Sequence, residues 1–229
     1  MRLSNLSITV LFSLLLAAIP LYAAEQSSDI ADAMETGDFS RVQELIRDGV
    51  DVNEPQIDGA TALHWASQWN DVQSARQLIN AGAEVNVANR TDATPLQLAA
   101  INGSAEMLSI LLEAGANPNT TVTFTQDTPL MLASKTGIPE AVEVLIEYGA
   151  DVNAMETWGR TTALMWAVAE GHTEVAAILI DEGADLEART IFVPPDTTRG
   201  FEGSPPRDRE ETESGAVQHS SGELTPLHF

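Results

Sequence analysis

The sequence predicts an all-α fold, in which helix–turn–helix units stack into a solenoid and short hairpin loops connect them. The phrase Gly-Ala-Asp-Val-Asn, or a close variant, occurs five times at intervals of 33 or 34 residues. A threonine-led phrase recurs between these copies, and apolar residues follow at helical spacing. So regular a period indicates stacked structural units rather than one globular core. The five phrases contain Gly49, Gly82, Gly115, Gly149 and Gly183.

The threonine-led phrase predicts the first helix of a unit. A threonine hydroxyl can satisfy a free backbone N–H at a helix start, and proline fits the first helical position, as at Pro95 and Pro129. Each helix should end where a residue tolerates a left-handed backbone. The phrases begin at Thr61, Thr94, Thr128 and Thr162, and the predicted ends are Asn70, Gly103, Gly137 and Gly171.

A second helix is predicted in each unit because apolar residues recur at helical spacing, as at Leu108, Leu111 and Leu112. It should end at the glycine of the closing phrase. The next eight or nine residues are polar and rich in turn formers, which predicts a connecting loop. Neither helix alone can bury its apolar stripe, so each pair must stack on the next and the core must run along the array.

These phrases resemble the ankyrin repeat family, whose pattern of Thr-Pro-Leu-His, a central Gly-His and a closing Gly-Ala-Asp-Val-Asn is matched almost whole by residues 157–187. The first unit lacks the opening phrase. It is predicted to be the N-terminal cap because Asp29, Asp32 and Glu35 make one side of its first helix polar. The resemblance implies an array over 24–190 with repeats at 28–53, 54–86, 87–119, 120–153 and 154–187.

The N-terminus predicts a signal peptide over residues 1–23. Ile8 to Ile19 form a short apolar run, and small residues precede a cut after Ala23 or Ala24. An uncleaved anchor helix is the alternative, but this run is shorter than the ~20 residues that span a bilayer. We therefore expect export, to a periplasm or out of the cell, and no membrane span after signal removal. The chain has no cysteine, so its stability must come from packing.

The C-terminal region departs from the repeat pattern. Residues 191–221 are acidic and rich in proline, which predicts a flexible insertion. The phrase returns at Thr225-Pro226-Leu227-His228, so residues 222–229 are predicted to begin a further, truncated repeat. The sequence would then be the front part of a longer protein. The alternative is a natural disordered tail with a coincidental match.

Composition argues against several partners and chemistries. The formal net charge of -23 repels polyanions, which excludes nucleic acid and favours a partner protein with a basic or amphipathic surface. No calcium loop, phosphate loop, metal-spaced histidine pair or nucleophile elbow is present. We therefore predict no catalytic residue, no cofactor and no metal site, and a protein that is not an enzyme.

The histidines and acids of the repeats are predicted to be structural. By resemblance to the family, His64 and His172 bond to neighbouring backbone and hold turns. An acid that follows the glycine of each closing phrase can accept hydrogen bonds from turn amides. These acids are Asp51, Glu84, Asp151 and Asp185.

Partner binding is expected on a concave face, because family members commonly bind proteins there with loop tips and the exposed ends of first helices. Large aromatic residues tend to dominate interface energies, so Trp69, Phe124 and Trp158 are the predicted anchors. The alternative is that they pack against adjacent loops and stiffen the array. Trp65 and Trp166, which share one repeat position, are predicted to lie in the core. The predicted partner-binding residues are Ile57, Gln68, Trp69, Arg90, Ile101, Asn102, Phe124, Lys135, Trp158 and Glu170.

The predicted function is therefore a non-catalytic scaffold for protein–protein interaction. Two alternatives stay open at this point. The repeats could be the regulatory or targeting arm of an enzyme whose catalytic domain lies beyond residue 229. They could also serve a structural role through self-association at an uncapped end.

Overall fold

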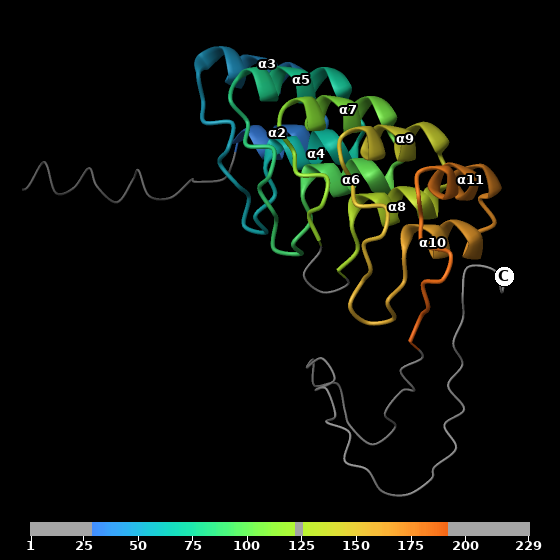
Figure 1. Ribbon diagram of the computed structural model, residues 1–229. Coiled ribbons are helices and arrows are strands. Elements are labelled where there is room, and N and C mark those ends of the chain that lie inside the picture. Colours follow the sequence, from blue (N-terminus) through green and yellow to red (C-terminus); the bar gives the residue numbers. More distant parts are fainter. Residues whose placement is uncertain (1–28, 122–125, 192–229) are drawn as a thin grey trace, which may run out of the picture.

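The computed structural model describes residues 29–121 and 126–191, and within them the secondary structure consists of helices, turns and bends without strands. The ten helices of these described residues lie in two parallel rows (Figure 1). The inner row contains α2 (Asp29–Glu35), α4 (Ala62–Gln68), α6 (Pro95–Ile101), α8 (Pro129–Thr136) and α10 (Ala163–Ala169). The outer row contains α3 (Phe39–Asp48), α5 (Val72–Asn80), α7 (Ala105–Glu113), α9 (Pro139–Glu147) and α11 (Thr173–Asp181). The predicted all-α solenoid is confirmed.

Packing is between nearest neighbours along the array. Each inner helix contacts the next inner helix, each outer helix contacts the next outer helix, and the two helices of a pair contact each other. The buried residues form one continuous cluster from Ile30 to Leu179. The last four units each contribute a buried leucine to it at the second helical position of the inner helix, as in Leu96 and Leu130, and the first unit contributes Ile30 there. The loops project together beside the inner row (Figure 1).

The predicted helix starts and ends are confirmed. The hydroxyls of Thr128 and Thr162 accept hydrogen bonds from the backbone N–H three residues later, and Pro129 occupies the first turn of α8. Thr61 and Thr94 form capping boxes with His64 and Gln97. All four predicted helix ends have positive φ, from 54° at Asn70 to 78° at Gly171.

The loops contain one strained position. It lies two residues before each cap threonine and has positive φ in all four units. Gly59 occupies it in the first loop, where a Cβ atom would lie 3.3 Å from the backbone of Arg90. The other loops place side chains there at φ near 60°, a conformation that costs about 1–2 kcal/mol outside glycine. These residues are Asp92, Gln126 and Arg160.

A ladder of asparagines joins successive units. In each closing phrase the asparagine donates from Nδ2 to the glycine carbonyl of the next closing phrase and accepts at Oδ1 from a backbone N–H two residues after that glycine. Asn119, for example, bonds to Gly149 O at 3.0 Å and to Asp151 N at 2.8 Å. The ladder continues to Gly183 and Asp185, and Glu187 replaces the next asparagine. Its members are Asn53, Asn86, Asn119 and Asn153.

Several predictions concern residues outside the described part of the chain. They are the signal peptide at 1–23, nearly all of the insertion at 191–221, the repeat start at 222–229 and the anchor Phe124. Among the residues that the structure does describe, no helix combines the length and the apolar character needed to cross a membrane.

Candidate partner-binding surface

The candidate site is the surface that the inner helices and the neighbouring loop tips share, which we call the inner face. Equivalent repeat positions fall into rows along it, because the units stack in register. The first row contains Trp65, Leu98, Leu132 and Trp166, and the second Gln68, Ile101, Lys135 and Ala169. The third contains Trp69, Asn102, Thr136 and Glu170. The described loop-tip row contains Ile57, Arg90 and Trp158.

Four large apolar side chains of the inner face lie open to solvent. Their exposed fractions are 86% for Ile57, 55% for Trp69, 51% for Ile101 and 48% for Trp158. Gln68, Arg90 and Glu170 are exposed as well. An exposed apolar surface that is rimmed by polar groups is typical of an interaction site.

Trp65 and Trp166 were predicted to be core residues, and this prediction is wrong. Both are only half-buried, and they pack against the core from the inner face. Trp65 stacks on Trp69, with 6.2 Å between ring centroids and 19° between planes. The physical reason is that the first row points away from the outer helices, so only one face of each ring meets the core. The Trp65–Trp69 pair makes a continuous aromatic surface.

The N-terminal end of the inner face is fixed by one glutamine. Gln56 Oε1 accepts a hydrogen bond from Trp65 Nε1 at 2.7 Å. Its Nε2 donates to Asp32 Oδ1 at 2.6 Å and to Glu35 Oε2 at 2.7 Å. Both acids belong to α2, so this loop residue ties the first helix pair to the indole of the second. The same end of the inner face is acidic.

The C-terminal half of the inner face is organised around Lys135. Its ammonium lies 3.8 Å from the centroid of the Trp166 ring and 3.2 Å from Asp127 Oδ2. The side chain is only 28% exposed. A cation held over an indole and paired with a carboxylate is fixed in place, which orients the Trp166 ring. The Lys135 side chain is therefore held in place by contacts within the array.

Asn102 also bonds within the array. Its Nδ2 donates to the carbonyl oxygens of Ser67 and Gln68, at 3.0 and 2.9 Å. These two carbonyls belong to the last turn of α4, where intrahelical partners are absent. The predicted contact residues thus include exposed aromatic side chains, such as Trp69 and Trp158, and polar side chains that bond within the array, such as Asn102 and Lys135.

The two described histidines make the backbone contacts that the resemblance implies. His64 is buried, its Nδ1 accepts from Thr61 N at 3.1 Å, and its Nε2 lies 3.1 Å from Ala93 O. Burial lowers the pKa of His64 below its usual value, although hydrogen bonds to the backbone of Ala93 and Val87 oppose this shift. His172 Nε2 lies 3.1 Å from Lys135 O.

Three of the four acids of the closing phrases have the predicted turn role, whereas for Glu84 the structure shows its backbone N–H donating to Asn53 Oδ1 at 2.7 Å. Asp51, Asp151 and Asp185 each accept a hydrogen bond from the backbone N–H two residues later, at 2.9 Å. Another acid, Glu156, was not singled out by sequence reasoning. It is buried and accepts from three backbone N–H groups of its loop, those of Trp158, Gly159 and Thr161. It fixes the loop that carries Trp158.

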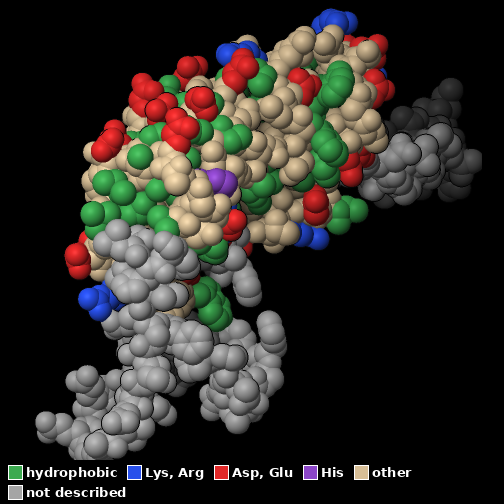
Figure 2. All heavy atoms as spheres, turned by 90° about the vertical axis from the view of Figure 1, so that its right-hand side faces the viewer, with side chains coloured by type: hydrophobic (Ala, Val, Ile, Leu, Met, Phe, Trp, Pro, Cys, Tyr) green, Lys and Arg blue, Asp and Glu red, His purple; other side chains and the backbone are tan. Residues whose placement is uncertain are grey.

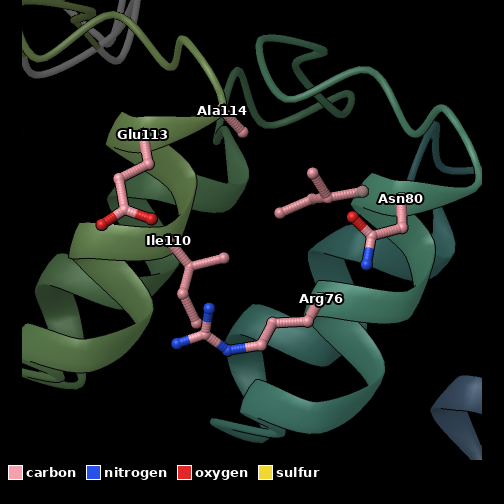
Figure 3. A pocket seen from close by; sticks show the side chains of 6 residues that line it. Arg76, Asn80, Ile110, Glu113 and Ala114 are labelled. Carbon is pink, nitrogen blue, oxygen red and sulfur yellow. The ribbon is translucent and has the colours of Figure 1, made fainter.

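Hollows lie on the outer row, where sequence reasoning predicted nothing. One of about 240 Å³ separates α5 from α7, with Arg76 extending toward Ile110 and Glu113 on the facing helix (Figure 3). Arg76 is paired with Glu106 at 3.6 Å. A similar hollow separates α3 from α5. Both are open to solvent and have no converging buried polar groups, so the inner face remains the stronger candidate.

Acidic side chains gather on the outer helices at the C-terminal end of the array. Figure 2 looks onto this end and shows them spread over its upper part. The exposed acids of α9 and α11 are Glu140, Glu143, Glu147, Glu174 and Asp181, and Glu182 follows α11. The part of the chain that the structure describes holds no group of acids and histidines arranged for a metal ion.

Comparison with known proteins identifies the repeats. A family model described as ankyrin repeats (3 copies) matches residues 30–122 and again residues 120–190. Together the two matches cover all the described helices except the first residue of α2. A search of curated proteins gave no match.

Proposed function

Because the chain belongs to the ankyrin repeat family, whose members generally serve as protein–protein interaction modules, we propose that it is a non-catalytic scaffold that binds a partner protein on its inner face. The observation that supports this most is the exposed aromatic surface of Trp69 and Trp158. Exposed indoles lose unfavourable contact with water when a partner covers them, and such residues often carry ~2 kcal/mol or more each at interfaces.

The partner that this surface fits is basic or amphipathic. Asp32 and Glu35 make the N-terminal end of the inner face acidic, and the net charge of the whole chain is -23. Such a field speeds the encounter with a positively charged protein and opposes like-charged ones. The apolar groups Ile57, Trp69 and Ile101 would receive the apolar side of an amphipathic partner segment.

We also propose that the protein acts after export, in a periplasm or outside the cell. The support is the signal-like sequence of residues 1–23, and the complete absence of cysteine leaves the fold independent of the redox state of that compartment. Pulse labelling of the full chain in the source organism, with mass measurement of the exported product, tests this. Protein that stays in the cytoplasm with its first 23 residues attached contradicts it.

Affinity capture from the source organism tests the binding proposal. The double variant Trp69→Ala/Trp158→Ala should bind the captured partner more than tenfold more weakly, while helical circular dichroism and the thermal midpoint stay nearly unchanged. Added salt should weaken binding by the parent chain. The matched control is Tyr148→Ala, which removes an exposed aromatic side chain from the end of α9 in the outer row.

Two results contradict the proposal. One is equal affinity of the parent chain and the double variant, since the anchors would then contribute nothing. The other is a loss of folding in the double variant that matches its loss of binding, since the two tryptophans would then be structural. Weaker binding by Tyr148→Ala would move the interface to the outer row.

A further inference from the structure

The C-terminal end of the described array exposes apolar side chains at positions that are more deeply buried in the units before it. Val168 of α10 is half-buried, whereas the equivalent Ala100 has an exposed fraction of 0%. Ile180 of α11 is 44% exposed, against 6% for the equivalent Leu112. Leu186, after α11, is 37% exposed. These residues form the end face, which has the composition of an interface between two units.

The chain after α11 already follows the path of a further loop. Ile191 N donates to Gly159 O at 2.8 Å. The same bond joins the first two loops, where Arg90 N donates to Asp58 O at 2.8 Å. Asp185 also makes the usual turn bond, to Glu187 N. Residues 184–191 therefore lie in register as the first arm of a sixth loop.

We propose that the segment beginning at Thr225 docks on the end face as the inner helix of a sixth unit, and that the residues between Ile191 and Thr225 are an insertion in its loop. Thr225-Pro226-Leu227-His228 has the letters of the opening phrase. Leu227 takes the position of four leucines that are at most 1% exposed inside the array. These are Leu63, Leu96, Leu130 and Leu164.

The spacing fits such an insertion. Thr61 follows Asn53 by eight residues and Thr162 follows Asn153 by nine, whereas Thr225 follows Glu187 by 38. A longer loop costs little, because the entropy of loop closure grows only slowly with length. The inserted residues are rich in proline and charge, so they compete poorly for an apolar surface.

Charge favours this occupant over a second copy of the chain. The exposed acids Glu174, Asp181 and Glu182 border the end face on α11 and just after it. Two copies meeting end to end would bring these acids together. The opening phrase carries no acid, and Pro226 and Leu227 supply the apolar contact that Val168 lacks.

The natural absence of cysteine allows a direct test. Val168→Cys in the full chain places one thiol on the end face, and the rate of its reaction with a thiol reagent measures how well that face is covered. Adding Leu227→Asp should raise the rate at least tenfold, because the docking leucine is lost. The matched control, Leu224→Asp, adds the same charge just before the phrase and should leave the rate unchanged.

Equal rates with and without Leu227→Asp overturn the proposal. Protection of Val168→Cys that appears only as protein concentration rises also overturns it, because a second copy would then cover the face. Hydrogen exchange in α2 to α5 should be the same in all variants. This readout separates undocking at the end from unfolding of the array, and neither measurement depends on partner binding at the inner face.

Discussion

The hydrogen bonds of His64 at the start of a helix make the stability of the protein depend on pH. Its Nδ1 accepts from Thr61 N, which requires the neutral ring, and its Nε2 then donates to Ala93 O. Burial lowers the pKa of His64 below its ordinary value of 6.5. The unfolded chain therefore takes up the proton first. This contribution to stability is complete above pH 6.5 and is lost as pH falls through the lower pKa of the folded state.

The next unit supplies the variant that tests this. Gln97 takes the position of His64 and makes the same bond, from Thr94 N to Oε1 at 2.9 Å, without a titrating group. His64→Gln should therefore lose less stability than the parent chain when pH falls below 6.5. Urea unfolding followed by circular dichroism at a series of pH values measures the difference. Parallel pH profiles of the two chains would contradict the prediction.

Single residues also mark where sequence reasoning reaches its limit. The threonine caps and the apolar stripe of a second helix, as at Leu108 and Leu111, follow from local pattern, and both were predicted correctly. Trp65 was misplaced because a large apolar residue on a short helix is compatible with either side of that helix, and only the stacking direction decides which side meets the core. Asn102 looked free for a partner, because its acceptors on α4 are 34 and 35 residues away in sequence.

The connection between loops depends on the asparagine ladder, an element-level feature that sequence reasoning missed. The repeated asparagine of the closing phrase was visible in the sequence, but no role was predicted for it. Its partners lie about 30 residues further along the chain, so their proximity appears only when units are stacked. The signal that could have identified it is the recurrence of asparagine at Asn53, Asn86, Asn119 and Asn153, where any turn former would otherwise serve.

Asn119→Ala tests the ladder. The change removes the bonds to Gly149 O and Asp151 N in the middle of the array and should lower the free energy of unfolding by about 1–2 kcal/mol. Chemical denaturation measures it. Asn80→Ala removes the same amide from the exposed surface of α5 and should change stability by less than about 0.5 kcal/mol. Similar losses in the two variants would show that the ladder is energetically unimportant.

At the scale of the whole molecule, the stacking of the repeats was the property that the sequence predicted best. The two ends of the array were the least predictable part. A fixed period with two helices per unit leaves few alternatives to a linear array, because isolated pairs cannot bury their apolar stripes. The surface that such an array offers to a partner is less constrained, since exposed positions are free of the packing that restricts the core. For that reason Trp69 and Trp158 remain candidates by exposure and chemistry, whereas Leu130 is placed by packing alone.

Because helices contact only their neighbours along the array, the loss of stability caused by a substitution in one unit should become smaller with distance from that unit. Leu130 lies fully buried in α8, which contacts α6, α9 and α10. Leu130→Ala should reduce stability by about 2–5 kcal/mol through lost burial and the cavity left behind. Hydrogen exchange with mass spectrometry should show the largest loss of protection in α8 and its contacting helices and the smallest in α2 and α3. A uniform loss from α2 to α11 would mean that the array unfolds as one cooperative core, contrary to nearest-neighbour coupling.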